Sequence, residues 1–184
     1  ETTGFNIFYN DIIEIAAVDN FGNEFTTLVK SSKSLPKKII DITNITDEML
    51  EKSGEDIVDA LNNFNNYICN PEYCKLNTYL VGHNSYSFDI PFIKAQFQKY
   101  NIKFPNFNSI DTMRMAQLLM PNEWSHSLQN LCRLFGIENK NAHRALSDVY
   151  ATQSIYKNLL IIYRSWFKEE KLSIKNIIKK IKFR

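Results

Sequence analysis

The hydrophobic positions of the chain follow two patterns, short apolar runs and longer stretches with helical spacing. Residues 12–18 form an apolar run with β-branched side chains, and a second strand-like segment at 24–30 follows a Gly-containing turn. Such a turn between two strands predicts an antiparallel hairpin. We expect two further short strands, a buried one at 78–84 and another at 107–110.

Helical spacing accounts for most of the remaining chain. Residues 56–69 place apolar side chains three and four positions apart, and residues 34–50 form a connection in which Thr46 precedes a short helix. Further helices are predicted at about 90–100, 112–120, 126–135 and 144–163. Because strands and helices alternate, the pattern predicts an α/β domain.

Composition removes several classes of enzyme. The chain has 184 residues, of which 44% are hydrophobic and 23% charged, which is typical of one globular domain. The spacing of its five glycines excludes a Walker A loop, a dinucleotide-binding GxGxxG and a GxSxG elbow, and HExxH is absent. The sequence therefore lacks the usual motifs of nucleotide-cofactor enzymes, serine hydrolases and zincins.

The basic charge of the chain is concentrated at its C-terminal end. Residues 168–184 hold seven Lys and Arg against two Glu, so the preceding residues are slightly acidic. The spacing of isoleucines and lysines predicts a basic amphipathic helix, or the start of a linker, at residues 166–184. Packing on the domain, contact with nucleic acid and attachment to a larger protein remain open for this segment.

The cysteines indicate an intracellular protein. Cys69, Cys74 and Cys132 are odd in number and form no secretory framework, so reduced thiols are expected. A zinc site on Cys69 and Cys74 would lack a second closely spaced pair. We expect a cytoplasmic location, with a viral or organellar origin left open.

Three separated stretches carry candidate chemistry: Glu1-Thr2-Thr3-Gly4, residues 81–93 and residues 142–148. Asp89 lies where a helix begins, and unpaired amides there would favour its ionised form. Taken alone it reads as an ordinary helix cap. His143 and Asp148 are five positions apart, so they share a site only if His143 precedes a helix that contains Asp148.

Together these stretches resemble the DEDDh 3′–5′ exonucleases, the proofreading-subunit and ribonuclease T-like group with a ribonuclease H-like fold. That family shows D-x-E-T-T-G, G-H-N-x-x-x-F-D and H-x-A-x-x-D, which Glu1–Gly4, Gly82–Asp89 and His143–Asp148 match. The resemblance extends from residue 1 to about 160. His143 in place of a tyrosine favours the DEDDh over the DEDDy branch, and Asn44 stands where the family usually has Gly.

The resemblance implies an exonuclease domain at residues 1–165, with a central mixed five-stranded sheet flanked by helices. The family's first aspartate would lie two positions before Glu1, together with most of the central strand. We therefore expect the printed sequence to be part of a longer protein, and expect its residues alone to be inactive or nearly so. A natural pseudoenzyme is the alternative.

The resemblance also implies the roles of individual residues. Two Mg²⁺ or Mn²⁺ ions would be held by the absent aspartate, Glu1 and Asp148, with Asp89 completing the shell. His143 would accept a proton from the attacking water. The terminal nucleotide would contact Thr2, Thr3, Asn84 and Phe88, the last by stacking on a base. We interpret Asp111 as a structural cap and His83 as a structural histidine.

The activity implied is a two-metal 3′–5′ exonuclease that removes nucleoside monophosphates from single-stranded or frayed DNA. A role in proofreading or repair, beside a DNA polymerase contacted through the C-terminal region, would follow. Two alternatives remain from the sequence alone. One is an exoribonuclease that trims RNA 3′ ends, and the other is a non-catalytic module of the same fold that binds nucleic acid or protein.

Overall fold

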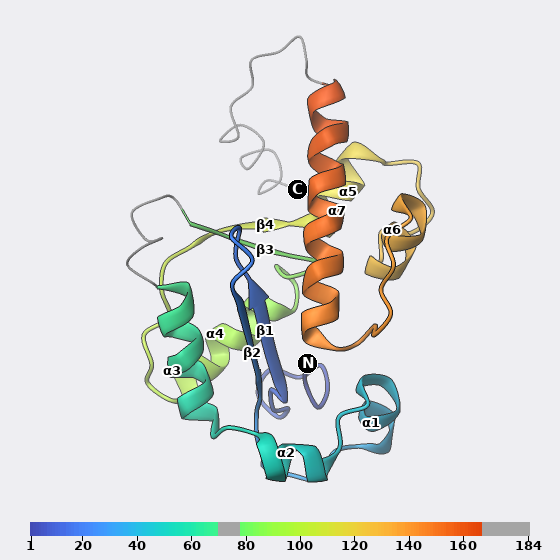
Figure 1. Cartoon of the computed structure of the whole chain (residues 1–184). Coiled ribbons are helices and arrows are strands. Elements are labelled where there is room, and N and C mark those ends of the chain that lie inside the picture. The colour runs from blue at the N-terminus through green and yellow to red at the C-terminus, as the bar shows by residue number, and fades with distance from the viewer. Residues whose placement is uncertain (70–77, 167–184) are drawn as a thin grey trace.

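The computed structural model describes residues 1–69 and 78–166 (Figure 1). In chain order the elements are β1 (Glu14–Val18), β2 (Glu24–Leu28), α1 (Lys37–Thr43), α2 (Asp47–Ser53), α3 (Ile57–Ile68), β3 (Tyr79–Gly82), α4 (Asp89–Lys99), β4 (Asn108–Asp111), α5 (Thr112–Leu119), α6 (Leu128–Phe135) and α7 (Ala145–Trp166). The chain is therefore α/β, as predicted.

The strands form two separate pairs. β1 and β2 are antiparallel, with Glu14 opposite Leu28, and β3 and β4 are parallel, with Gly82 opposite Asp111. Within the described residues each pair is a two-stranded sheet of its own. The described residues therefore form two separate strand pairs in place of the single five-stranded sheet expected from the resemblance.

The long helix α7 packs against β1 and also against α5 and α6 (Figure 1). Its buried side chains Ile155 and Leu159 share a hydrophobic cluster with Met115 and Leu131. The first turn of α7 and the N-terminus of the chain lie close together in Figure 1. Packing of α7 on β1 therefore brings the last predicted motif to the first.

The secondary-structure predictions agree with the structure except in the burial of one strand and in one helix. The hairpin, the short strands and the helices at 56–69, 90–100, 112–120, 126–135 and 144–163 are all present. β3 is only half-buried, because one side of it is not covered and Val81 is 38% exposed. The segment 34–50 contains a second helix, α1, that was not predicted.

Asn44 ends α1 in the left-handed conformation, with φ of 56°. Glycine is the residue that adopts this conformation at least cost, and asparagine follows it. The difference from the family's usual glycine at this position is therefore accommodated by the turn.

Two expectations concern parts of the chain that are not described. The basic helix predicted at 166–184 lies outside the described residues, apart from Trp166 at the end of α7, and so does Cys74. Among the described helices, none has both the length and the apolar character needed to cross a membrane.

Candidate active site

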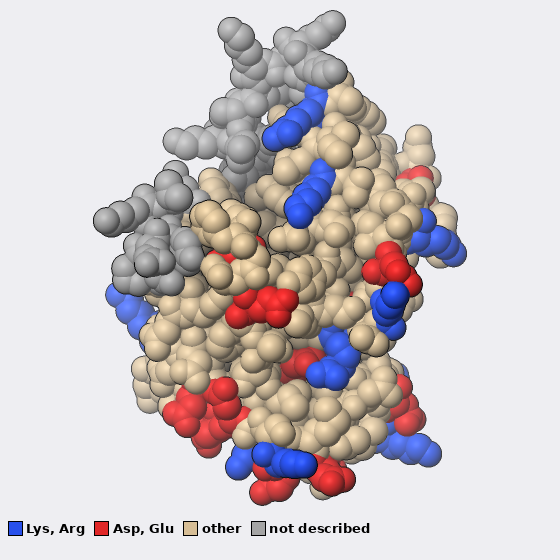
Figure 2. Space-filling view, in the orientation of Figure 1, with Lys and Arg blue, Asp and Glu red and all other residues tan. Residues whose placement is uncertain are grey.

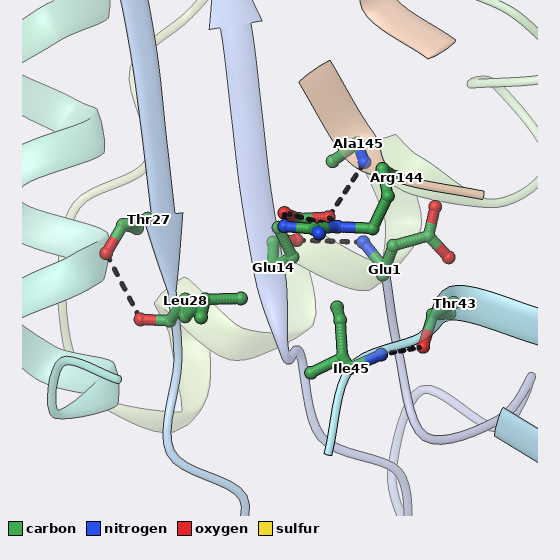
Figure 3. A network of polar contacts seen from close by, with 8 residues as sticks. All are labelled: Glu1, Glu14, Thr27, Leu28, Thr43, Ile45, Arg144 and Ala145. Atoms are coloured by element: carbon green, nitrogen blue, oxygen red, sulfur yellow. Dashed lines mark hydrogen bonds and ion pairs between the residues drawn. The ribbon is translucent and has the colours of Figure 1, made fainter. Parts of the chain in front are cut away.

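The first residues of the chain are fixed against the segment that leads into β1. The backbone N–H of Ile13 donates to the carbonyl of Glu1 at 2.9 Å, and the N–H of Thr3 donates to the carbonyl of Asp11 at 2.9 Å. The Glu1 α-ammonium donates to the Glu14 carbonyl at 2.8 Å. Backbone pairing therefore sets the position of Glu1, while its side chain extends away from β1 (Figure 3).

The Glu1 carboxyl lies among charged groups of both signs. No hydrogen bond reaches it from residues 1–69 or 78–166, as the unconnected carboxyl in Figure 3 illustrates. Burial raises its pKa, the α-ammonium and His143 lower it, and the carboxylates of Asp148 and Glu14 raise it further, so that the pKa lies above its ordinary value. Because loss of water destabilises the charged form, a bound cation would relieve this cost.

A buried ion pair fixes the start of α7 to β1. The Arg144 guanidinium donates to the Glu14 carboxylate, at 2.7 Å from Nη2 and 3.1 Å from Nε, and the N–H of Ala145 donates to the same carboxylate at 2.8 Å (Figure 3). The Glu14 side chain is only 3% exposed. In Figure 2 basic and acidic side chains adjoin in the middle of the visible face. The pair holds the residue after His143 in place.

His143 and Asp148 are related as the sequence required. His143 precedes α7, and Asp148 lies in its first turn. The backbone N–H of His143 donates to Asp148 Oδ2 at 3.2 Å, and the imidazole Nε2 lies 3.4 Å from Gln129 Nε2. His143 has a φ of 64°, in the left-handed region, while its side chain is exposed. An exposed imidazole on a fixed loop can reach an incoming ligand.

Asp89 differs from its expected state. It begins α4, but the N-cap position is Phe88 and carries no side-chain cap bond. Solvent reaches the Asp89 side chain, yet the surrounding protein displaces enough water to raise the pKa of its carboxyl, and the α-ammonium of Glu1 lowers it. The pKa of the Asp89 carboxyl therefore lies above its ordinary value, with loss of hydration as the main cause.

Asp111 shapes the loop that leads to Asp89. Its buried carboxylate accepts hydrogen bonds from the N–H groups of Asn84 and Tyr86, each at 3.0 Å, and from Met113 at 2.9 Å. It thus caps α5 and fixes the loop after β3, which confirms its interpretation as a structural residue. Gly82 is required there, because a Cβ on it would meet Ser85 Cβ at 2.6 Å.

The predicted nucleotide-contacting residues lie on these two loops. Thr2 Oγ1 donates to the Gly4 carbonyl at 2.8 Å, and Thr3 Oγ1 accepts from the N–H of Asp11 at 2.9 Å. Asn84 has a φ of 58°. The half-buried ring of Phe88 packs edge-on against Phe5, with the centroids 5.9 Å apart. Phe5, the residue after the first motif, is therefore in contact with the middle motif through two aromatic rings.

The carboxylates suit a hard divalent cation by chemistry, but they do not form a finished ligand set. Oxygen donors are what Mg²⁺ and Mn²⁺ prefer. In the described ranges, however, no group of three or more His, Cys, Asp and Glu residues is placed to hold a metal ion. The structure brings the Glu1 carboxyl close enough to Asp148 and His143 for their charges to shift its pKa.

His83 is structural, as interpreted from the sequence. Its Nδ1 lies 2.9 Å from Thr112 Oγ1, and burial lowers its pKa, which favours the neutral ring. It therefore holds the end of β3 against the start of α5.

Sequence reasoning missed several residues around the site. Glu14 and Arg144 form their pair across 130 positions, and Asn139 contacts Asp148 from the loop before α7. Gln129 approaches His143 from α6. One sequence feature could have identified Glu14, because an acidic residue inside an otherwise apolar strand requires a buried partner. Arg144, Asn139 and Gln129 lack such a feature.

Comparison with known proteins assigns the family. The family model described as Exonuclease matches residues 1–156. The DNA polymerase III PolC-type protein of Mycoplasma genitalium is 37% identical over 162 residues, which are 85% of this chain and 11% of that protein. The Bacillus subtilis protein of the same name is 34% identical over 165 residues, again 11% of its length. The chain thus spans about a tenth of these relatives.

Solved structures agree in fold. E. coli Exonuclease I in complex with a dT13 oligonucleotide gives a TM-score of 0.70 at 21% identity, covering 88% of this chain and 39% of that one. Exonuclease X in complex with 5′ overhanging duplex DNA gives a TM-score of 0.67 at 20% identity, covering 98% and 95%. The two strand pairs and their helices are therefore parts of a ribonuclease H-like fold, and the chain belongs to the DnaQ-like exonuclease family, in its DEDDh branch.

Proposed function

We propose that this chain is the exonuclease unit of a 3′–5′ DNA exonuclease that removes nucleoside monophosphates from single-stranded or frayed ends. The match of the exonuclease family model over residues 1–156 is the observation that carries the proposal. The PolC-type relatives are named as DNA polymerases, which favours DNA over RNA and a role in proofreading or repair beside a polymerase. Two structural neighbours are complexes with DNA.

The proposal includes a divalent-metal site, with two Mg²⁺ or Mn²⁺ ions held by Glu1, Asp89 and Asp148 and by a ligand outside this chain. When bound, such ions activate water and stabilise the developing negative charge of phosphodiester hydrolysis. The partly buried Glu1 carboxyl, which accepts no hydrogen bond from the described residues, supports a cation at this position. The same three residues also supply the oxygen donors that these ions require.

The remaining residues bind the substrate and move a proton. His143 is proposed to accept a proton from the attacking water, for which its exposure and its fixed backbone are suited. Thr2 and Thr3, beside Glu1, and Asn84 and Phe88, before Asp89, are proposed to hold the terminal nucleotide. Stacking of one base on an aromatic ring contributes about 1–3 kcal/mol.

The test is degradation of a 5′-labelled single strand by the protein extended upstream of Glu1 by its own coding sequence. We expect a ladder that shortens from the 3′ end with Mg²⁺ or Mn²⁺ and stops with EDTA. Asp148→Asn should lower kcat at least about 100-fold, the scale found for one electrostatic group. A matched RNA strand tests the sugar preference. Undiminished activity in EDTA, or binding without shortening, would overturn the proposal.

A further inference from the structure

Asn139, in the loop between α6 and α7, contacts the side chain proposed to bind metal. Its amide Nδ2 donates to Asp148 Oδ1 at 2.6 Å, and its Oδ1 accepts from Ser147 Oγ at 2.6 Å. All three side chains are partly buried. Asn139 therefore bridges two residues of the first turn of α7 from outside the helix.

The chemistry of the groups fixes which way the amide points. An ionised carboxylate can only accept hydrogen bonds, so the NH₂ of Asn139 must face Asp148. The amide oxygen then faces Ser147, whose hydroxyl can donate. Ser147 thus orients the Asn139 amide, and the amide in turn orients Asp148.

The contact continues from Asp148 to His143. The second carboxylate oxygen, Oδ2, accepts the backbone N–H of His143 at 3.2 Å. His143 has a φ of 64°. For any residue other than glycine this backbone conformation is unfavourable in free energy, and it persists only when surrounding contacts hold it. Movement of the Asp148 carboxylate would therefore remove one of the hydrogen bonds that hold the loop carrying the imidazole.

We propose that Asn139 is a positioning residue for the hydrolysis, one that sets the Asp148 carboxylate and, through it, the His143 loop. This inference rests on the proposed function. In this role Asn139 donates one hydrogen bond to Asp148, and a side chain of equal size without a donor cannot replace it. Two lone-pair positions of the carboxylate are used by Asn139 and His143, and the others stay available.

The decisive comparison is Asn139→Asp against Asn139→Ala. Aspartate keeps the size and the acceptor for Ser147, but it replaces the donor by a second carboxylate beside Asp148, and two such groups repel each other. We expect kcat/KM of the extended protein to fall about 100-fold with Asn139→Asp and about 10-fold with Asn139→Ala, mainly through kcat. A role in packing alone predicts the opposite order, since aspartate fills the space and alanine does not.

The matched control is Asn158, also a hydrogen-bonded amide, which donates to the Ser154 carbonyl at 2.9 Å further along α7. Asn158→Asp and Asn158→Ala should change kcat/KM less than about twofold, the scatter expected away from the site. Ser147→Ala should give a smaller loss than either Asn139 variant, because the amide keeps its contact with Asp148.

A second measurement does not depend on activity. A hydrogen bond to a carboxylate moves an amide proton downfield, so the His143 amide resonance should move upfield in Asn139→Asp and stay unchanged in Asn158→Asp. If the parent protein fails to hydrolyse DNA, the proposed function fails and this resonance still tests the geometry. The inference is overturned if Asn139→Asp is at least as active as Asn139→Ala, or if the His143 resonance does not move. It is also overturned if the activity of each variant falls only in proportion to the fraction of protein that is folded. Should Asn139→Asp not fold, Asn139→Ala must still move the His143 resonance, and an unmoved resonance there would contradict the inference.

Discussion

Individual carboxyl groups of this protein lie in two contrasting environments. Asp11 Oδ2 accepts hydrogen bonds from Ser31 Oγ at 3.1 Å and from the Ser32 N–H and Oγ at 2.8 and 2.7 Å. The Glu1 carboxyl accepts none from the described residues. Donors satisfy a structural carboxylate, whereas a partly buried carboxylate without them is suited to bind a cation or a substrate. The number of hydrogen-bond donors therefore distinguishes Asp11 as a structural residue from Glu1 as a candidate binding residue, although the two are only ten positions apart.

Asp11 gives a pH-dependent prediction. Burial alone would raise its pKa, but the hydrogen bonds from Ser32 and Ser31 outweigh this and lower the pKa below the ordinary value of 3.8. The folded state thus favours the ionised form, so this stabilisation is complete above about pH 3.8 and is lost as the pH falls through the lower folded-state pKa. Asp11→Asn should lower the free energy of unfolding by roughly 1 kcal/mol at pH 7 and by less at pH 3.

Urea unfolding at pH 7, 5 and 3 measures this difference, with Asp41→Asn, an exposed position on α1, as the control. The control should differ little from the parent at each pH. A difference between Asp11→Asn and the parent that stays constant down to pH 3 would contradict the assigned cause.

At the scale of elements, the site depends on how α7 meets β1. Neither element alone carries all the candidate residues, because Glu1 is fixed beside β1 whereas His143 and Asp148 are at the start of α7. The Glu14–Arg144 pair crosses this junction, with the Glu14 side chain only 3% exposed and the Arg144 side chain 35% exposed. Breaking one partner of a buried pair leaves an uncompensated charge, which is costly.

Arg144→Met should therefore destabilise the fold strongly. We expect the free energy of unfolding to fall by about 2 kcal/mol, less than for a fully buried pair because the Arg144 side chain is 35% exposed. Arg144→Met combined with Glu14→Gln should lose less, because no buried charge is left alone. The control is Lys140→Met, whose pair with Glu138 has side chains 74% and 73% exposed and should contribute under about 1 kcal/mol. Equal losses for Arg144→Met and Lys140→Met in urea unfolding would show that the junction does not depend on this pair.

At the scale of the whole molecule, local sequence features predicted the elements and missed the contacts between them. α6 shows why the first part succeeded: Ser127 caps its start through the Asn130 N–H, and Gly136 ends it with φ of 64°, both visible in the sequence. α1 was missed because Pro36 offers no side-chain cap and the helix has only seven residues.

The site could be predicted only in part, for the same physical reason. The motifs gave Glu1, Asp89, His143 and Asp148, and the left-handed backbone of His143 allows it to precede α7 as required. The Glu14–Arg144 pair and the loss of hydration at Asp89 depend on which distant segments pack together. Periodicity and spacing carry no information on that packing.

The central claim is that acidic side chains from distant segments form one metal site. The most direct measurement is anomalous scattering from crystals of the protein extended upstream of Glu1 and soaked in Mn²⁺. We expect a manganese peak about 2.0–2.6 Å from carboxylate oxygens of Glu1 and Asp148, with Asp89 bound directly or through water. A site without manganese, or manganese bound by other residues while these carboxylates stay unligated, would contradict it.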